Sequence, residues 1–177
     1  MISLLVAAEI AQKPAFANLS DRLDLISCSI RGEDYMYTGV YRLEIDTKQR
    51  VPVPPKLMRV LRENKSKHLF MTRGMDRCIA CYDQQGWDSY QSRVCAVDMA
   101  EKDKNNLIRE LIKSAQKVKL DWKHRITIHN DLMNWAGIST QRAVVVGCGE
   151  FFEIWDPNEY EEMKKDQGSI YGTKPPL

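Results

Sequence analysis

The chain contains an internal duplication, and this feature constrains its fold more than any other. Residues 44–53 (EIDTKQRVPV) recur loosely as residues 119–128 (KLDWKHRITI), an offset of 121 − 46 = 75 positions. At the same offset Leu57-Met58 falls on Leu132-Met133, and after a gap of two residues Gly74 falls on Gly147. A match kept over about forty residues is hard to obtain without duplication, so we expect two similar halves.

Each copy predicts the order strand, turn, strand, helix, strand, turn, strand. Alternating residues 39–45 and the run from Val51 read as strands, prolines end the second strand, and Pro54 or Pro55 opens a helix. Apolar residues at helical spacing between 98 and 119, including Leu107, Leu111 and Val118, predict an amphipathic linker helix. The expected organisation is an extension (1–35), a first repeat (36–97), the linker helix (98–118), a second repeat (119–165) and a tail (166–177).

The halves are too small to be stable alone, so we expect them to pack, or to exchange hairpins, into one body. The 177 residues carry a net charge of +2, which is uninformative, but residues 42–73 hold nine Lys or Arg against three acids. Such an excess is either a solvated face or a surface for a polyanion. Five cysteines without a disulfide pattern and the lack of a long apolar window favour a soluble, cytoplasmic protein.

Both copies carry the motif Asp-x-x-x-Arg, as Asp46…Arg50 and Asp121…Arg125, and residues 144–157 read VVVGCGEFFEIWDP. With Gly39-Val-Tyr41, these residues resemble the MraZ proteins of bacteria over about residues 36–165. The resemblance implies an α+β fold of two AbrB-like swapped-hairpin repeats forming a pseudo-dimeric barrel with additional helices. It also implies ring-shaped homo-oligomers and a nucleoid-associated transcriptional regulator. Such a regulator binds repeated double-stranded DNA sites upstream of the division and cell wall gene cluster, which includes its own gene.

The chain departs from the family pattern at several positions. Family members commonly begin with Met-Phe-x-Gly, which Met36-Tyr-Thr-Gly39 fits, so residues 1–35 are either a lineage-specific arm or the product of a mis-assigned start codon. The family usually has Gly before the motif Arg, where this chain has Gln49 and His124. If that position needs a positive φ, a non-glycine residue costs about 1 kcal/mol or more, which leaves the shape of the turn open.

The motif has two interpretations. A turn at the tip of a β-ribbon can enter a DNA groove, where Arg50 and Arg125 suit bidentate contact with guanine or phosphate. In that case Asp46 and Asp121 orient the arginines or cap the turns. Lys48, Lys123 and His124 then add phosphate contacts. Alternatively, Asp-x-x-x-Arg is a structural turn closed by a salt bridge worth at most about 1 kcal/mol.

Other functional classes have weaker support. Cys78 and Cys81 would point to opposite faces of a strand, so we expect no metal site there. No nucleophile, base and orienting group form a recognisable set, so we expect no enzyme, no cofactor and no small-molecule substrate. Two alternatives to a DNA-binding regulator stay open: a ring-forming interaction protein that has lost DNA recognition, and an AbrB-like antitoxin. The sequence favours neither activation nor repression.

Overall fold

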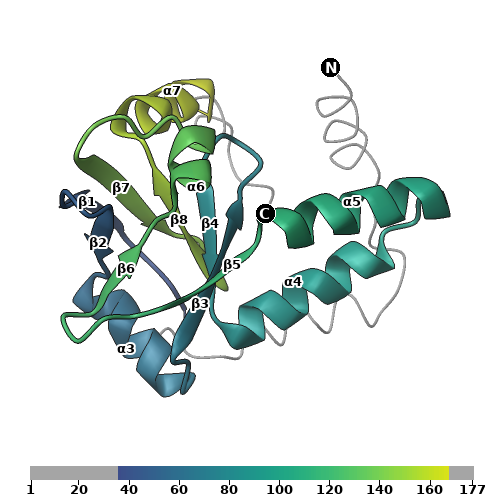
Figure 1. The fold of residues 1–177 in the computed structure, drawn as a ribbon, viewed down its shortest axis with the longest axis horizontal. Coiled ribbons are helices and arrows are strands. Elements are labelled where there is room, and N and C mark those ends of the chain that lie inside the picture. The colour runs from purple at the N-terminus through teal and green to yellow at the C-terminus, as the bar shows by residue number, and fades with distance from the viewer. Residues whose placement is uncertain (1–35, 168–177) are drawn as a thin grey trace, which may run out of the picture. The chain divides into compact units, whose positions relative to one another are not determined.

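The computed structural model describes residues 36–167, so the expected extension (1–35) and residues 168–177 of the expected tail lie outside the described part. The first repeat forms β1 (Val40–Glu44), β2 (Arg50–Pro52), α3 (Pro55–Glu63), β3 (His68–Arg73), β4 (Ile79–Tyr82) and α4 (Gln84–Ala96). After α5 (Glu101–Ser114), the second repeat forms β5 (Gln116–Lys119), β6 (Arg125–Thr127), α6 (Asn130–Trp135), β7 (Arg142–Gly147), β8 (Phe151–Trp155) and α7 (Pro157–Gln167). The order of elements expected for the two copies is confirmed, and the fold is mixed α+β (Figure 1).

The repeats are joined by strands that pair with the opposite copy. The order of the six-stranded sheet is β1-β7-β8-β4-β3-β5, and all its pairs are antiparallel. The first strand of each repeat therefore lies beside the third strand of the other: β1 pairs with β7, and β5 pairs with β3. The small sheet of β2 and β6 also joins the two copies. Neither repeat completes its sheets alone.

The strand order is symmetric. Exchanging the repeats replaces β1 by β5, β3 by β7 and β4 by β8, and the resulting order is the same sheet read from its other edge. In the small sheet Val51 pairs with Ile126, its own counterpart at the 75-residue offset. An approximate two-fold axis thus passes between β4 and β8 and between Val51 and Ile126.

The pairing does not show a closed barrel. Within residues 36–167, β1 and β5 are the edge strands of the six-stranded sheet, while β2 and β6 pair only with each other. The described body is therefore a six-stranded sheet with a separate two-stranded ribbon.

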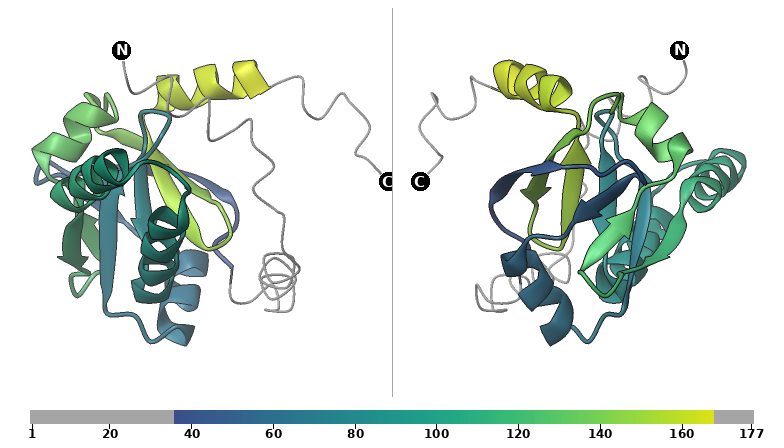
Figure 2. Two further views of the ribbon diagram at one scale, coloured as in Figure 1. Left: turned by 90° about the vertical axis from the view of Figure 1, so that its right-hand side faces the viewer. Right: turned by 60° about the vertical axis from the view of Figure 1, so that its left-hand side comes forward.

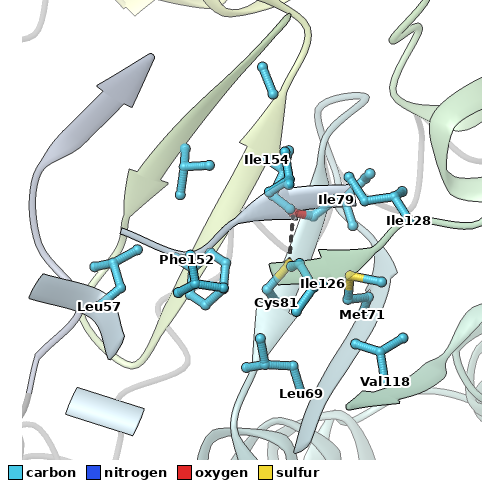
Figure 3. Close-up of a cluster of buried hydrophobic side chains, with 14 of the residues drawn as sticks. Leu57, Leu69, Met71, Ile79, Cys81, Val118, Ile126, Ile128, Phe152 and Ile154 are labelled. Carbon is cyan, nitrogen blue, oxygen red and sulfur yellow. Dashed lines mark hydrogen bonds between the residues drawn. The ribbon is translucent and has the colours of Figure 1, made fainter. Parts of the chain in front are cut away.

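The main hydrophobic core lies between this sheet, the β2–β6 ribbon and α3. The ribbon contributes Val51 and Ile126, which are almost fully buried, and α3 contributes Leu57 and Leu61 from one face. Figure 3 shows Leu57 and Ile126 in this cluster with side chains from β3, β4 and β8. The ribbon is consequently anchored in the core, although the turns at its ends reach the surface.

The opposite face of the sheet carries two smaller apolar clusters. One contains Trp87 of α4, and the other contains Tyr160 of α7. Both helices follow a buried aspartate: the Asp83 side chain accepts a hydrogen bond from the Gly86 amide and the Asp156 side chain one from the Asn158 amide, each at 2.8 Å. These contacts satisfy helix-starting amides, so equivalent helices begin alike in the two repeats.

The linker helix is shorter than the sequence predicted. It ends at Ser114, and Val118, expected on its apolar stripe, lies instead in β5 opposite Leu69 of β3. The side chain of Val118 is buried in the core, while Lys117 and Lys119 point outward. The prediction of a helix to residue 118 was wrong because β3 has a free edge that this alternating segment fills.

Candidate functional site

The first motif forms a tight turn closed by the side chain of Asp46. Its Oδ1 accepts hydrogen bonds from the backbone amides of Lys48 at 2.9 Å and Arg50 at 3.0 Å. Its Oδ2 accepts from Nε of Arg50 at 2.7 Å and forms an ion pair with Nη2 at 2.7 Å. One carboxylate therefore both fixes the backbone of the turn and orients the guanidinium.

The second motif repeats this arrangement. Oδ1 of Asp121 accepts from the amides of Lys123 at 2.8 Å and Arg125 at 2.9 Å. Oδ2 accepts from Nε of Arg125 at 2.8 Å and pairs with its Nη2 at 2.7 Å. The Asp and Arg of the motif thus play the same structural roles in both copies, which accounts for their fixed spacing.

The antiparallel β2–β6 ribbon joins the two turns, which enter it from opposite ends. Beyond the ribbon pairs, the amide of Val53 donates to the carbonyl of His124 and the amide of Ile128 to the carbonyl of Gln49, both at 2.9 Å. Nη1 of Arg125 also lies 3.4 Å from Oδ2 of Asp46. In Figures 1 and 2 the ribbon lies on the opposite side of the fold from α4 and α5, with α3 at one end. The two motifs form a single surface, which we call the paired turns (46–50 and 121–125).

The residue before each arginine has a left-handed backbone. Gln49 has φ of 58° and His124 has φ of 57°. A side chain in this conformation costs about 1–2 kcal/mol, and glycine avoids that cost. Both turns therefore have the same left-handed backbone at this position, although neither has glycine there. The sequence left the shape of the turn open, and the structure shows that the chain keeps this shape and accepts the backbone strain.

The electrostatics of the paired turns follow from their ion pairs. The hydrogen bond from the Arg50 guanidinium lowers the pKa of Asp46 from its ordinary value of 3.8 to about 2. The equivalent bond from Arg125 lowers the pKa of Asp121. Both carboxylates are therefore ionised at neutral pH, and each offsets the charge of one arginine.

The lysines and the histidine expected at the site lie at the tips of the turns. Lys48, Lys123 and His124 are all exposed. Nη2 of Arg62, at the end of α3, lies 3.0 Å from Nε2 of His124. Because a guanidinium can only donate, this nitrogen of His124 is the acceptor of the hydrogen bond. In the first turn Gln49 bonds instead to Asn130, the first residue of α6.

Two residues of this surface were not among the predicted site residues. Arg62 lies in the last turn of α3, 62 positions before His124 in the sequence, and only the folding of the two repeats together brings them into contact. Trp122, the residue after the second motif Asp, is 82% exposed. Its sequence signal was a tryptophan where the first copy has Thr47, in a turn otherwise made of polar residues.

Neither of the two cysteines weighed as a metal site belongs to the paired turns. Cys78 and Cys81 are buried in different apolar clusters, on opposite faces of the sheet. Within residues 36–167 no cluster of three or more His, Cys, Asp or Glu residues could hold a metal ion. None of the helices described is long and apolar enough to span a bilayer.

Comparison with known proteins matches both halves of the chain. A family model described as "MraZ protein, putative antitoxin-like" matches residues 36–110 and again 111–170, which confirms the duplication. A protein of Alkaliphilus oremlandii named "Transcriptional regulator MraZ" is 30% identical over 136 residues, covering 77% of this chain and 92% of the relative. Proteins of the same name from Ligilactobacillus salivarius and Acetivibrio thermocellus are 32% and 26% identical, covering 71% and 75% of this chain and 85% and 89% of their own lengths. The chain therefore belongs to the MraZ family.

Proposed function

We propose that the protein is a transcriptional regulator that binds double-stranded DNA sequence-specifically through the paired turns. The observation that carries this proposal is a pair of arginines, each oriented by its own aspartate, on two turns that meet where Nη1 of Arg125 lies 3.4 Å from Oδ2 of Asp46. Its relatives carry the name "Transcriptional regulator MraZ", which agrees with this role and with a protein that is not an enzyme.

The geometry suits a groove of DNA. A two-stranded β-ribbon fits the major groove, and an arginine held in a fixed direction suits bidentate contact with guanine O6 and N7. Each aspartate occupies Nε and Nη2 of its own arginine, so the Nη1 side of the guanidinium is the one that can face DNA. In Arg125 this nitrogen also lies near Asp46. We therefore assign the stronger base contact to Arg50 and the weaker one to Arg125.

The remaining residues of the paired turns add affinity without reading sequence. Lys48, Lys123 and His124 are exposed in the same turns, and we assign them contacts with phosphates, which position a protein on the duplex. Asp46 and Asp121 act through the arginines as positioning residues.

One pair of turns would bind DNA weakly, close to the non-specific range of about 10⁻⁴ to 10⁻⁶ M. A homo-oligomeric ring that engages repeated sites gains about 10² to 10⁴ in affinity through effective concentration alone. We propose that the protein acts as such a ring, at repeated sites upstream of its own gene and the neighbouring division and cell wall genes, and is cytoplasmic and nucleoid-associated.

Fluorescence anisotropy of a labelled fragment from upstream of the gene tests this function. We expect the wild type to prefer this fragment over a scrambled one, Arg50→Ala to abolish the preference and Arg125→Ala to weaken it. Arg93→Ala is the matched control, because Arg93 is likewise ion-paired to a carboxylate but contacts Glu150, outside the paired turns. Equal binding of both fragments by the wild type would contradict the proposal. That result would instead favour the alternative function, a ring-forming interaction protein without DNA recognition.

A further inference from the structure

The two turns share one backbone frame but present different tips. The positions between Asp and Arg hold Thr47, Lys48 and Gln49 in the first turn. In the second turn they hold Trp122, Lys123 and His124. Because the hydrogen bonds of the two frames match one for one, the difference lies in the side chains offered to a partner.

Trp122 contributes nothing to the core. The chain has four tryptophans, and Trp87 and Trp155 are buried at 5% and 2% exposure. Trp135 is half-buried, and its indole nitrogen donates to the carbonyl of Gly74. Trp122, by contrast, is 82% exposed. Its ring is a large apolar surface held in solvent at the end of the ribbon that also carries Arg125.

The charges around this ring favour a polyanion. Nζ of Lys123 lies 4.7 Å from the centre of the Trp122 ring, in a cation–π contact. Arg62 lies beside the next residue, His124. The nearest acid in the turn, Asp121, is already paired with Arg125. An apolar ring flanked by cations matches the major groove of DNA at a thymine, where phosphates border a base edge that carries an apolar methyl group.

We propose that Trp122 is a specificity-determining residue that contacts base edges, in particular thymine C5-methyl groups, in the major groove reached by the second turn. This inference rests on the proposed DNA-binding function. Apolar side chains recognise thymine through that methyl group. The shorter Thr47 reaches less far from the first turn. A single protomer therefore reads two unlike DNA segments, and its site on DNA has a direction.

The test compares thymine with uracil, which lacks only the C5-methyl group. Duplexes of the upstream fragment are prepared with uracil at single thymine positions, and binding is measured for the wild type and for Trp122→Thr, which installs the first-turn residue. We expect the wild type to lose affinity about tenfold at one or more positions, a loss typical of one base contact. Trp122→Thr should bind the thymine duplex about tenfold more weakly and no longer distinguish uracil at those positions.

A second measurement does not depend on the threonine variant. DNA containing the site should quench the tryptophan fluorescence of the wild type, and Trp122→Phe should remove most of that change while keeping an aromatic contact. Thermal unfolding of both variants should match the wild type, because the ring is exposed.

The possible outcomes distinguish a failure of the Trp122 contact from a failure of the proposed DNA-binding function. If the wild type prefers its upstream fragment, and Arg50→Ala abolishes that preference while Trp122→Thr binds like the wild type, the role of Trp122 is wrong and DNA binding stands. A Trp122→Thr loss that is equal on thymine, uracil and scrambled duplexes also overturns the thymine contact. If the wild type shows no preference at all, both proposals fall.

Discussion

Arg125 lies between two carboxylates, its own Asp121 at 2.7 Å from Nη2 and Asp46 of the other repeat at 3.4 Å from Nη1. Asp46 thus contacts both motif arginines, whereas the side chain of Asp121 bonds to Lys123 and Arg125 of its own turn. The two aspartates are equivalent in sequence but not in the network that they form.

This inequality predicts different effects for the same substitution. Asp46→Asn should disturb the orientation of both Arg50 and Arg125, while Asp121→Asn should disturb mainly Arg125. We expect Asp46→Asn to lower Tm further and to weaken binding of the upstream fragment more. Scanning calorimetry and anisotropy on both variants check this. Equal losses would show that the contact between the repeats has no energetic role.

The low pKa of Asp46 predicts a loss of stability in acid. The Arg50 hydrogen bond lowers that pKa from 3.8 to about 2, so folding favours the ionised form. The carboxylate therefore stabilises the folded state above about pH 4, and this contribution disappears as the pH falls toward 2. Urea unfolding of the wild type and Asp46→Asn should differ at pH 7, and the difference should shrink below about pH 4 and vanish only as the pH falls below about 2.

The comparison between variants is needed because other acids titrate in the same range. Hydrogen bonds from Lys164 and Arg42 lower the pKa of Glu161 to about 2 as well. That contribution is lost equally in both proteins and cancels in the difference. A difference that stays constant from pH 7 to about pH 2.5 would assign the effect of Asp46→Asn to packing.

The left-handed residues predict two stabilising substitutions. Gln49→Gly and His124→Gly remove side chains from φ values of 58° and 57°. Relief of about 1–2 kcal/mol is partly offset by the greater freedom of glycine in the unfolded chain, leaving a gain of about 0.5–1 kcal/mol. Thr47→Gly is the control, because Thr47 is not among the positive-φ positions. Glycine relieves no strain there, so this substitution should lower the stability of the protein. Chemical denaturation measures the free energy of unfolding of all three variants. If Gln49→Gly and His124→Gly both lower it, the backbone at these positions is not strained.

The ribbon centre predicts the largest stability effect. Ile126 is fully buried and pairs with Val51 on the approximate two-fold axis. Ile126→Ala should cost about 2–5 kcal/mol in the free energy of unfolding, because it leaves a cavity where both repeats meet. Val40→Ala, at a position that is 53% exposed, should cost far less. Similar values for the two variants in denaturant unfolding would show that the ribbon is not part of the core.

The sequence predicted the elements better than their partners. Period-two alternation and prolines located β1, β2 and the start of α3, because these signals are local. The same alternation is compatible with pairing inside one repeat or between repeats, so the exchange of β1 and β5 could not be read from it. Val118 shows the reverse problem: its spacing fits a helix, but a free strand edge far along the chain decides its conformation.

For the candidate site too, the sequence predicted the motif residues but not the contacts between them. The positions of Asp46, Arg50, Asp121 and Arg125 followed from the repeated motif. Their meeting across the ribbon depends on long-range pairing, as does the contact of Arg62 with His124. Trp122 could have been found by comparing the two copies. Both keep the motif Asp and Arg, but the residue after the Asp is Thr47 in one copy and Trp122 in the other.

The symmetric strand order has an evolutionary consequence. If each repeat were a separate chain, two identical copies would build the same sheet, and every mutation at a turn would appear on both sides of the axis. Fusion into one polypeptide removes that linkage while keeping the shared scaffold. Thr47 and Trp122 show the result, since one side of the axis has diverged from the other without loss of the frame that holds both.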